Sequence, residues 1–144
     1  MGQARGVMDR LMAAMAAKDK EALAGCYAAE AALRTPDRDG ITGREAIAGY
    51  FAGFWEAMPD VRYEHADRHE AGNVAIDEGF VVGTNTGPLA LPTGGTLPPT
   101  GRQVRVRSCD VATVEDGLIT SHRAYFDQLE LLGQLGLLPE PAQG

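Results

Sequence analysis

Two long runs of alternating apolar and polar residues flank Glu115-Asp116-Gly117, and they constrain the fold more than any other feature of the chain. A period of two is typical of a strand with one buried face, and an acidic residue followed by glycine between two such runs indicates a hairpin. The first run places these residues on its apolar face: Val104, Val106, Ser108, Asp110, Ala112 and Val114. Asp110 is therefore a carboxylate on the predicted buried face. Because an unpaired buried charge is costly, Asp110 needs a partner or a function.

The partner of Asp110 depends on the turn. If Asp116-Gly117 is a two-residue turn, Asp110 lies opposite Arg123, which gives a structural salt bridge. If residues 115–117 form a three-residue loop with a left-handed glycine, Asp110 lies opposite His122 instead. The second register places an aspartate and a histidine side by side on the concave face, and the residues alone leave both registers open.

Three segments near the end of the chain carry a resemblance to a known family: PPTGRQVRVR (98–107), CDVATVEDGLI (109–119) and HRAYFDQLELLGQLG (122–136). They resemble the C-terminal half of SnoaL-like polyketide cyclases, of the nuclear transport factor 2-like superfamily that also holds ketosteroid isomerases and limonene epoxide hydrolases. ITGREAIAGYF (41–51) resembles the third helix of that fold, and KDKEALAGCYAAEAAL (18–33) its second helix and first strand. The resemblance implies one α+β domain over residues 1–144. Its cone-shaped, curved mixed or antiparallel sheet would wrap around three N-terminal helices, followed by a short C-terminal helix.

The resemblance also implies roles for single residues. Asp110 aligns with an aspartic acid of the ketosteroid isomerase oxyanion hole and with a pocket histidine of the cyclases. This alignment agrees with the three-residue loop, which places His122 beside Asp110, so Asp110 and His122 are the catalytic candidates. At three other positions where the family carries catalytic groups, this chain has Leu11, Thr35 and Ala124.

A cavity inside the cone would be lined by methionine and aromatic side chains. A methionine stripe lies on the helix predicted over residues 6–17, and a second helix follows an N-cap at Asp19. An aromatic-rich helix is predicted between a capping box at residues 42–45 and Pro59. Core packing accounts most simply for the methionines and for a lone inward histidine. The residues predicted to bind substrate are Leu11, Met15, Thr35, Asp37, Phe54, Trp55, Tyr63, His65, Ala124 and Phe126.

The remaining segments predict strands, turns and one long loop. A short strand is expected over residues 31–35, a turn over 36–40, and two strands from Val61 and Val74 joined by a turn at 70–73. The last strand carries Thr120, His122, Ala124 and Phe126 on one face, which the resemblance places toward the cavity. Residues 87–101 are predicted to form a loop, either a lid or a plain connection. The leucine-rich segment 128–135 would close the cone or pack on a second subunit.

Composition narrows the partners and the compartment. A chain of 144 residues is the size of one domain, and its net charge of −7 argues against nucleic acid and anionic membrane partners. Only two cysteines occur, without metal-ligand spacing, so no metal is expected and a cytoplasmic location is the default. Asp9 and Arg10 leave an uncharged run of only residues 11–17 in the first apolar stretch, so a secretory signal peptide is not expected. The resemblance also implies that the protein is bacterial and that it forms a homodimer.

The function predicted first is cofactor-independent acid/base catalysis on a small hydrophobic carbonyl compound, of the polyketide cyclase or ketosteroid isomerase type. A protonated Asp110 could donate a hydrogen bond to an enolate oxygen. An ionised Asp110 paired with His122 could transfer protons. Two alternatives remain: a non-catalytic protein that binds a small molecule, and a dimerising accessory protein whose sheet binds a partner protein.

Overall fold

The computed structural model describes residues 3–90 and 94–137. The helices in this part of the chain are α1 (Gln3–Ala17), α2 (Lys20–Ala24), α3 (Arg44–Ala57) and α4 (Gln128–Gln134). The main sheet consists of β1 (Tyr27–Thr35), β2 (Arg38–Thr42), β3 (Arg62–Ala71), β4 (Val74–Thr84), β7 (Gln103–Glu115) and β8 (Leu118–Phe126). Two short strands, β5 (Leu89–Ala90) and β6 (Thr96–Leu97), form a separate ribbon.

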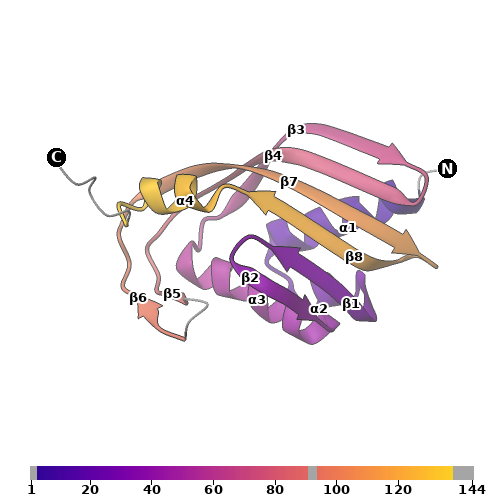
Figure 1. Ribbon diagram of the computed structural model, residues 1–144, viewed down its shortest axis with the longest axis horizontal. Coiled ribbons are helices and arrows are strands. Elements are labelled where there is room, and N and C mark those ends of the chain that lie inside the picture. The colour runs from indigo at the N-terminus through magenta and orange to yellow at the C-terminus, as the bar shows by residue number, and fades with distance from the viewer. Residues whose placement is uncertain (1–2, 91–93, 138–144) are drawn as a thin grey trace.

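The main sheet has the order β2-β1-β8-β7-β4-β3 and curves over the first three helices (Figure 1). β1 and β8 are parallel, whereas the other neighbouring pairs are antiparallel, so the sheet is mixed. β2 and β3 form its two edges, and the sheet therefore does not close. The α+β architecture with a curved sheet and a short C-terminal helix is confirmed.

The N-terminal helices follow their sequence signals. α1 buries one face, which carries Ala4, Val7, Met8, Leu11, Met12 and Ala14. Asp19 is the N-cap of α2, and its carboxylate accepts a hydrogen bond from the Ala22 amide at 3.0 Å. Tyr27 follows this helix and opens β1, where it is fully buried.

Two local predictions between β1 and α3 are wrong. Residues 38–40, expected within a turn, belong to β2, because this polar segment pairs with β1. The capping box at residues 42–45 does not form: Thr42 ends β2, and the N-cap is Gly43, whose φ of 97° suits glycine. The predicted end of the helix is confirmed, since α3 stops at Ala57, two residues before Pro59.

The β7–β8 hairpin has a register that neither turn alternative anticipated. Asp116 and Gly117 form a two-residue turn with φ values of 52° and 77°, and Glu115 pairs with Leu118. A β-bulge then adds Thr120 to β8, because Val114 pairs with Ile119 but Thr113 pairs with Ser121. The bulge shifts the remaining ladder by one residue.

As a consequence of the bulge, Asp110 lies opposite Ala124 and not opposite Arg123 or His122. His122 lies opposite Ala112, on the same face as Asp110 and one diagonal step away. The alternation predicted for β7 is confirmed, since its six predicted inward residues are all buried. The inner face predicted for β8 begins with Thr120 and is wrong at this end. Because of the bulge, the neighbouring Ile119 side chain is the one that is fully buried in the core.

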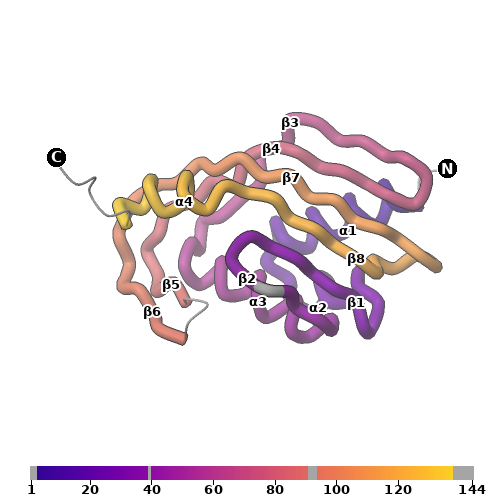
Figure 2. Tube along the Cα trace, in the orientation of Figure 1, coloured from indigo at the N-terminus to yellow at the C-terminus, as the bar shows by residue number. Residues whose placement is uncertain are grey.

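The segment 87–101 is held at both ends by Asn85, which is 2% exposed. The Asn85 side-chain amide donates to the carbonyl oxygens of Ala57 and Gly87 at 3.1 and 3.0 Å, and its oxygen accepts from the amide and hydroxyl of Thr100 at 2.8 and 2.9 Å. Where a loop was predicted, β5 and β6 form a ribbon beside α3, away from the main sheet (Figure 2). Residues 91–93 of this predicted loop lie outside the described residues.

α4 packs across one end of the sheet. Asp127 is its N-cap and accepts hydrogen bonds from the amides of Leu129 and Glu130, so its role is structural. Leu135 is buried in a cluster with Val104 and Val106, so the tail closes this end of the cone. Cys26 and Cys109 are both free thiols. None of the described helices is long and apolar enough to cross a membrane.

Candidate functional site

A cavity of about 210 Å³ lies between α1, α3 and the inner face of the sheet. Its wall is mostly apolar and aromatic, and it carries one buried carboxylate, that of Asp110. The lining residues are Met12, Met15, Ala16, Tyr50, Phe51, Phe54, Trp55, Met58, Val61, Arg62, Tyr63, His65, Val81, Val104, Val106, Ser108, Asp110, Ala124, Phe126 and Leu131. A small apolar ligand with a few polar groups fits such a wall.

Asp110, His122 and Tyr27 form a buried chain of hydrogen bonds behind this wall. The Oδ1 atom of Asp110 is 2.7 Å from Nε2 of His122, and Nδ1 of His122 is 2.7 Å from the hydroxyl oxygen of Tyr27. His122 and Tyr27 have no exposed surface and do not line the cavity. Asp110 is thus the member of the chain that a ligand can contact.

The protonation of this chain follows from Tyr27. Burial raises the pKa of the Tyr27 hydroxyl well above that of an exposed tyrosine, and the negative charge of Asp110 raises it further. The neutral phenol therefore donates its proton to Nδ1 of His122. The imidazole then carries its own proton on Nε2 and donates it to Asp110. Every polar atom between the three side chains has a partner. The second oxygen of Asp110, Oδ2, accepts a hydrogen bond of 3.5 Å from the Ser108 hydroxyl, and both residues line the cavity.

Aromatic rings hold His122 in this orientation. The rings of Tyr27 and Phe51 stack on the imidazole, each with a centroid distance of 6.0 Å and with interplanar angles of 15° and 23°. Phe51 also lines the cavity and separates His122 from it. The imidazole can therefore orient the Asp110 carboxylate without itself reaching a ligand.

Tyr63 crosses the sheet beside Asp110. Its hydroxyl donates to the carbonyl oxygen of Ser108 at 3.0 Å and lies 3.3 Å from that of Asp77. The ring reaches these carbonyls because position 79 is glycine: a Cβ there would lie 2.0 Å from the carbonyl oxygen of Glu64 and 2.9 Å from the Tyr63 ring. Burial raises the pKa of Tyr63, so its hydroxyl remains protonated.

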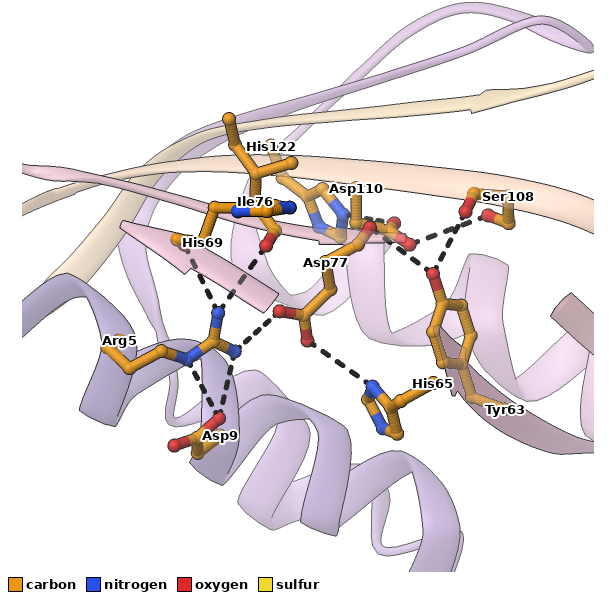
Figure 3. Close-up of polar contacts among 10 residues, drawn as sticks. All are labelled: Arg5, Asp9, Tyr63, His65, His69, Ile76, Asp77, Ser108, Asp110 and His122. Carbon is orange, nitrogen blue, oxygen red and sulfur yellow. Dashed lines mark hydrogen bonds and ion pairs between the residues drawn. The ribbon is translucent and has the colours of Figure 1, made fainter. Parts of the chain in front are cut away.

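A second buried carboxylate, Asp77, lies on β4 and pairs with Asp110 in the sheet register. Arg5 of α1 contacts its Oδ1 atom at 2.6 Å, and Nδ1 of His65 is 3.8 Å from Oδ2 (Figure 3). Burial raises the pKa of Asp77, while the hydrogen bond and charge of Arg5 lower it. Asp77 itself does not line the cavity, although His65 does.

The predicted site residues separate into two groups. The cavity brings together Asp110, Met15, Phe54, Trp55, Tyr63, His65, Ala124 and Phe126. Leu11 is fully buried in the core, and Thr35 and Asp37 lie at the β1–β2 connection and not in the wall. Asp37 touches the site indirectly, because it accepts a hydrogen bond of 2.8 Å from the hydroxyl of the lining residue Tyr50.

Sequence reasoning missed Tyr27, Asp77 and Arg5 as parts of the site. Asp77 had a usable signal, since it occupies an inward position in the alternation of its strand, as Asp110 does. Tyr27 had none, because 95 residues separate it from His122. Arg5 likewise reaches Asp77 from a helix far away in the chain.

One group of potential metal ligands occurs in the described part of the chain: Asp67, His69 and Glu78. All three are exposed on the β3–β4 hairpin and none lines the cavity. His69 and Glu78 already form an ion pair of 3.6 Å. These residues have no connection with the chemistry of Asp110.

Comparison with known proteins gives one family and many similar structures. The family model of the SnoaL-like domain matches residues 8–122. No curated protein sequence gives a match.

Three solved structures illustrate the likeness. A protein from Jannaschia sp. CCS1, named as a candidate SnoaL-like polyketide cyclase, is 19% identical with a TM-score of 0.83, over 95% of this chain and 94% of that one. TsrD from Streptomyces laurentii is 26% identical with a TM-score of 0.79, over 95% and 97%. A Catenulispora acidiphila protein with a ketosteroid isomerase-like fold, in complex with trimethylamine, is 21% identical with a TM-score of 0.75, over 92% and 93%.

Proposed function

This chain belongs to the SnoaL-like domain family, and we propose that it is an acid/base enzyme that moves a proton on a small hydrophobic carbonyl compound. One observation carries this proposal: the Asp110 carboxylate faces an aromatic cavity while a buried His122 and Tyr27 hold it from behind. A base that is fixed in place and faces an apolar ligand is suited to proton abstraction. No cofactor or metal is needed for this chemistry.

The proposed first step takes a proton from carbon. The Oδ2 atom of Asp110 accepts a proton from the carbon next to the ligand carbonyl, and the C–H electron pair moves into an enolate. Asp110 becomes a neutral carboxylic acid, while His122 keeps its hydrogen bond to Oδ1 throughout. His122 and Tyr27 act as positioning residues, because neither one contacts the ligand.

The enolate has two outcomes on this site. If Asp110 returns the proton to a different carbon, the result is an isomerisation. If the enolate carbon attacks a second carbonyl of the same molecule, the new alkoxide takes the proton from Asp110 and the result is an aldol cyclisation. Among the lining residues, Trp55 and Arg62 carry the N–H groups that could stabilise the enolate oxygen.

The relatives agree with this chemistry at the level of class. The Jannaschia neighbour is named as a candidate polyketide cyclase, and the Catenulispora neighbour has a small molecule bound on the same fold. Both likenesses support a ligand cavity in this chain. The substrate class itself rests on the wall of that cavity and on Asp110.

A second candidate function is the binding of a small molecule without turnover. It is favoured because apolar residues occupy two positions where the family carries catalytic groups. Leu11 lies in the core, and Ala124 lies directly opposite Asp110. A binding protein would use the same cavity and would stabilise the same ligands. Only a measurement of proton transfer separates the two functions.

That measurement is deuterium exchange. Ketones with a fused-ring or terpenoid skeleton are incubated with the protein in heavy water, and deuterium at the carbon next to the carbonyl is followed by mass spectrometry. We expect exchange with the unmodified protein and none with Asp110→Asn, which keeps the shape of the side chain. Asp116→Asn, in the exposed hairpin turn, is the matched control and should exchange normally.

Exchange that survives in a folded Asp110→Asn variant would refute the role of Asp110. Ligand-induced stabilisation without exchange in any variant would instead select the binding function. A ligand present at about one hundred times its dissociation constant adds about 2.7 kcal/mol to the free energy of unfolding, so thermal unfolding detects it.

We also propose that the protein is a homodimer, as the resemblance implies. Tyr125 and Leu129 are 55% and 65% exposed, and they are the large apolar side chains that the described residues expose most. Tyr125 points away from the cavity face of β8, so the outer face of the sheet is the contact surface that we favour. Light scattering of Tyr125→Ser tests it, with a monomer as the expected result.

A further inference from the structure

Arg5 fixes a buried negative charge beside the cavity. Its guanidinium donates to Asp9 Oδ1 at 3.0 and 2.8 Å and to the carbonyl oxygens of His69 and Ile76 at 3.3 and 3.5 Å. The remaining contact, 2.6 Å long, is with Asp77 Oδ1. With its guanidinium held on so many sides, Arg5 stays beside Asp77, where its hydrogen bond and charge favour the ionised carboxylate against the burial that raises the pKa of Asp77.

His65 lies on the other side of Asp77 (Figure 3). Its Nδ1 atom is 3.8 Å from Asp77 Oδ2, and its ring packs on Tyr63 with a centroid distance of 4.8 Å. A lone pair on Nδ1 would face the negative charge of Asp77, whereas an N–H there is attracted to it. The other ring nitrogen, Nε2, makes no hydrogen bond to any described residue, and His65 lines the cavity.

We infer that Asp77 and Arg5 hold His65 as the Nδ1–H tautomer, and that its Nε2 accepts a hydrogen bond from a hydroxyl group of the cavity ligand. His65 is thus a residue that determines ligand specificity, and the ligand class is a hydroxylated ring compound, such as a phenol or an enol. The hydrogen bond from the ligand hydroxyl to Nε2 rests on the proposed function of the cavity as a ligand site.

The charges around His65 support a neutral ring. Burial lowers the pKa of His65, and the positive charges of Arg68 and Arg5 lower it further, while the carboxylates of Asp77 and Asp9 raise it. The net direction is downward, so at neutral pH the imidazole is uncharged. A neutral ring with its proton on Nδ1 can only accept at Nε2.

The other polar groups of the wall point to the same ligand class. Asp110 presents a carboxylate oxygen, which also accepts hydrogen bonds. The hydroxyl protons of Tyr63 and Tyr50 are already donated to Ser108 and Asp37. The Ser108 hydroxyl is directed at Asp110 Oδ2, at 3.5 Å. Trp55 and Arg62 supply N–H donors to the wall, and Asp110 and His65 supply its side-chain acceptors. A ligand with hydroxyl groups satisfies both acceptors.

The tautomers can be read directly by nitrogen NMR. The chain has three histidines, His65, His69 and His122. In protein labelled with nitrogen-15 at histidine, we expect the proton of His65 on Nδ1 and that of His122 on Nε2, because their carboxylate partners face opposite ring nitrogens. Asp77→Asn should change the signals of His65 and leave those of His122 unchanged. A His65 ring with its proton on Nε2, or one that is unaffected by Asp77→Asn, would overturn the inference.

The hydroxyl recognition is tested with a matched pair of ligands, thymol and its methyl ether, which differ by the hydroxyl proton. We expect thymol to bind about tenfold more tightly to the unmodified protein, the effect of one hydrogen bond of about 1.4 kcal/mol. His65→Phe should remove this preference, whereas His69→Phe, on the exposed part of the same strand, should retain it.

Three results would overturn the recognition of hydroxyl groups: equal binding of the two compounds, a preference that persists in His65→Phe, or no binding of either. Deuterium exchange on ketones reports the proposed function separately. Failure of the hydroxyl recognition is therefore distinguishable from failure of the acid/base function.

Discussion

Asp77 on β4 and Asp110 on β7 lie directly opposite each other in the antiparallel ladder, so two buried carboxylates are neighbours on the inner face of the sheet. Each carboxylate has its own partner. Arg5 contacts Asp77 at 2.6 Å, and His122 contacts Asp110 at 2.7 Å. Because like charges on opposite positions of two strands repel, the pair is stable only while both partners are in place. This dependence leads to the first prediction.

Arg5→Met should destabilise the protein by about 3–5 kcal/mol, because it leaves the Asp77 carboxylate buried without a cation. The loss of Arg5 also raises the pKa of Asp77 further. A carboxyl group whose pKa is raised on folding favours the folded state in its protonated form, so the variant should regain stability as the pH falls. Urea unfolding at neutral and mildly acidic pH measures both effects.

A second substitution identifies the cause of that loss. Adding Asp77→Asn to Arg5→Met removes the unpaired charge, so the double variant should be more stable than Arg5→Met alone. Arg62→Met is the control for stability, since Arg62 is exposed and Glu64 is its ion-pair partner within the described part of the chain, and its effect should stay within about 0.5 kcal/mol. Strictly additive losses in the double variant would show that the carboxylate of Asp77 is not the reason.

Tyr27 should limit stability at alkaline pH. Burial raises its pKa well above the usual value of about 10, so the unfolded chain releases this proton first. The stabilisation is fully present below about pH 10 and is lost as the pH rises toward the folded-state pKa. Tyr27→Phe should cost about 1–3 kcal/mol at neutral pH, because it leaves Nδ1 of His122 without a donor. It should then lose less stability than the unmodified protein between about pH 9 and pH 11.

Urea unfolding across this range tests the prediction for Tyr27. Burial also raises the pKa values of Tyr50 and Tyr63, so the alkaline loss should be reduced in the variant but not abolished. Parallel stability curves for the two proteins would contradict an ionisation of Tyr27 coupled to unfolding.

The sequence predicted the faces of the strands better than their register. The alternation along β7 is a local property, and it correctly placed Asp110 on the inner face. The partner of Asp110 depends on the β-bulge at Thr120, which inserts one residue without a sequence signal. β2 escaped prediction for a similar reason, since a polar segment becomes a strand only by pairing with β1.

The side-chain contacts of the site were predictable only where the two residues lie close together in the sequence. Asp110 and His122 belong to one hairpin, and their proximity follows from it. Tyr27 and Arg5 approach from distant elements, so only the folded chain brings them to His122 and Asp77. Part of the cavity, including Tyr63, was anticipated from alternation in β3, but the enclosure itself depends on how α3 packs under the sheet.

Asn85→Ala should weaken the fold at the base of the β5–β6 ribbon. The variant loses four side-chain hydrogen bonds and leaves the carbonyl oxygen of Ala57 without its side-chain donor, so we expect a loss of about 3 kcal/mol in the free energy of unfolding. Thr86→Ala, at the exposed neighbouring position, should change stability by less than about 0.5 kcal/mol. Thermal unfolding of both variants gives the comparison, and equal midpoints would contradict a structural role of Asn85.

Ala124→Leu should block the cavity while the fold persists. Ala124 lines the cavity opposite Asp110, and a larger side chain there extends into space of about 210 Å³ instead of into packed atoms. The variant should therefore keep its stability within about 1.5 kcal/mol and lose the stabilisation by a bound ligand. Ala29→Leu, at an exposed position of β1, is the matched control and should still respond to ligand. If Ala124→Leu responds to thymol as the unmodified protein does, the ligand binds elsewhere, and the cavity beside Asp110 is not the functional site.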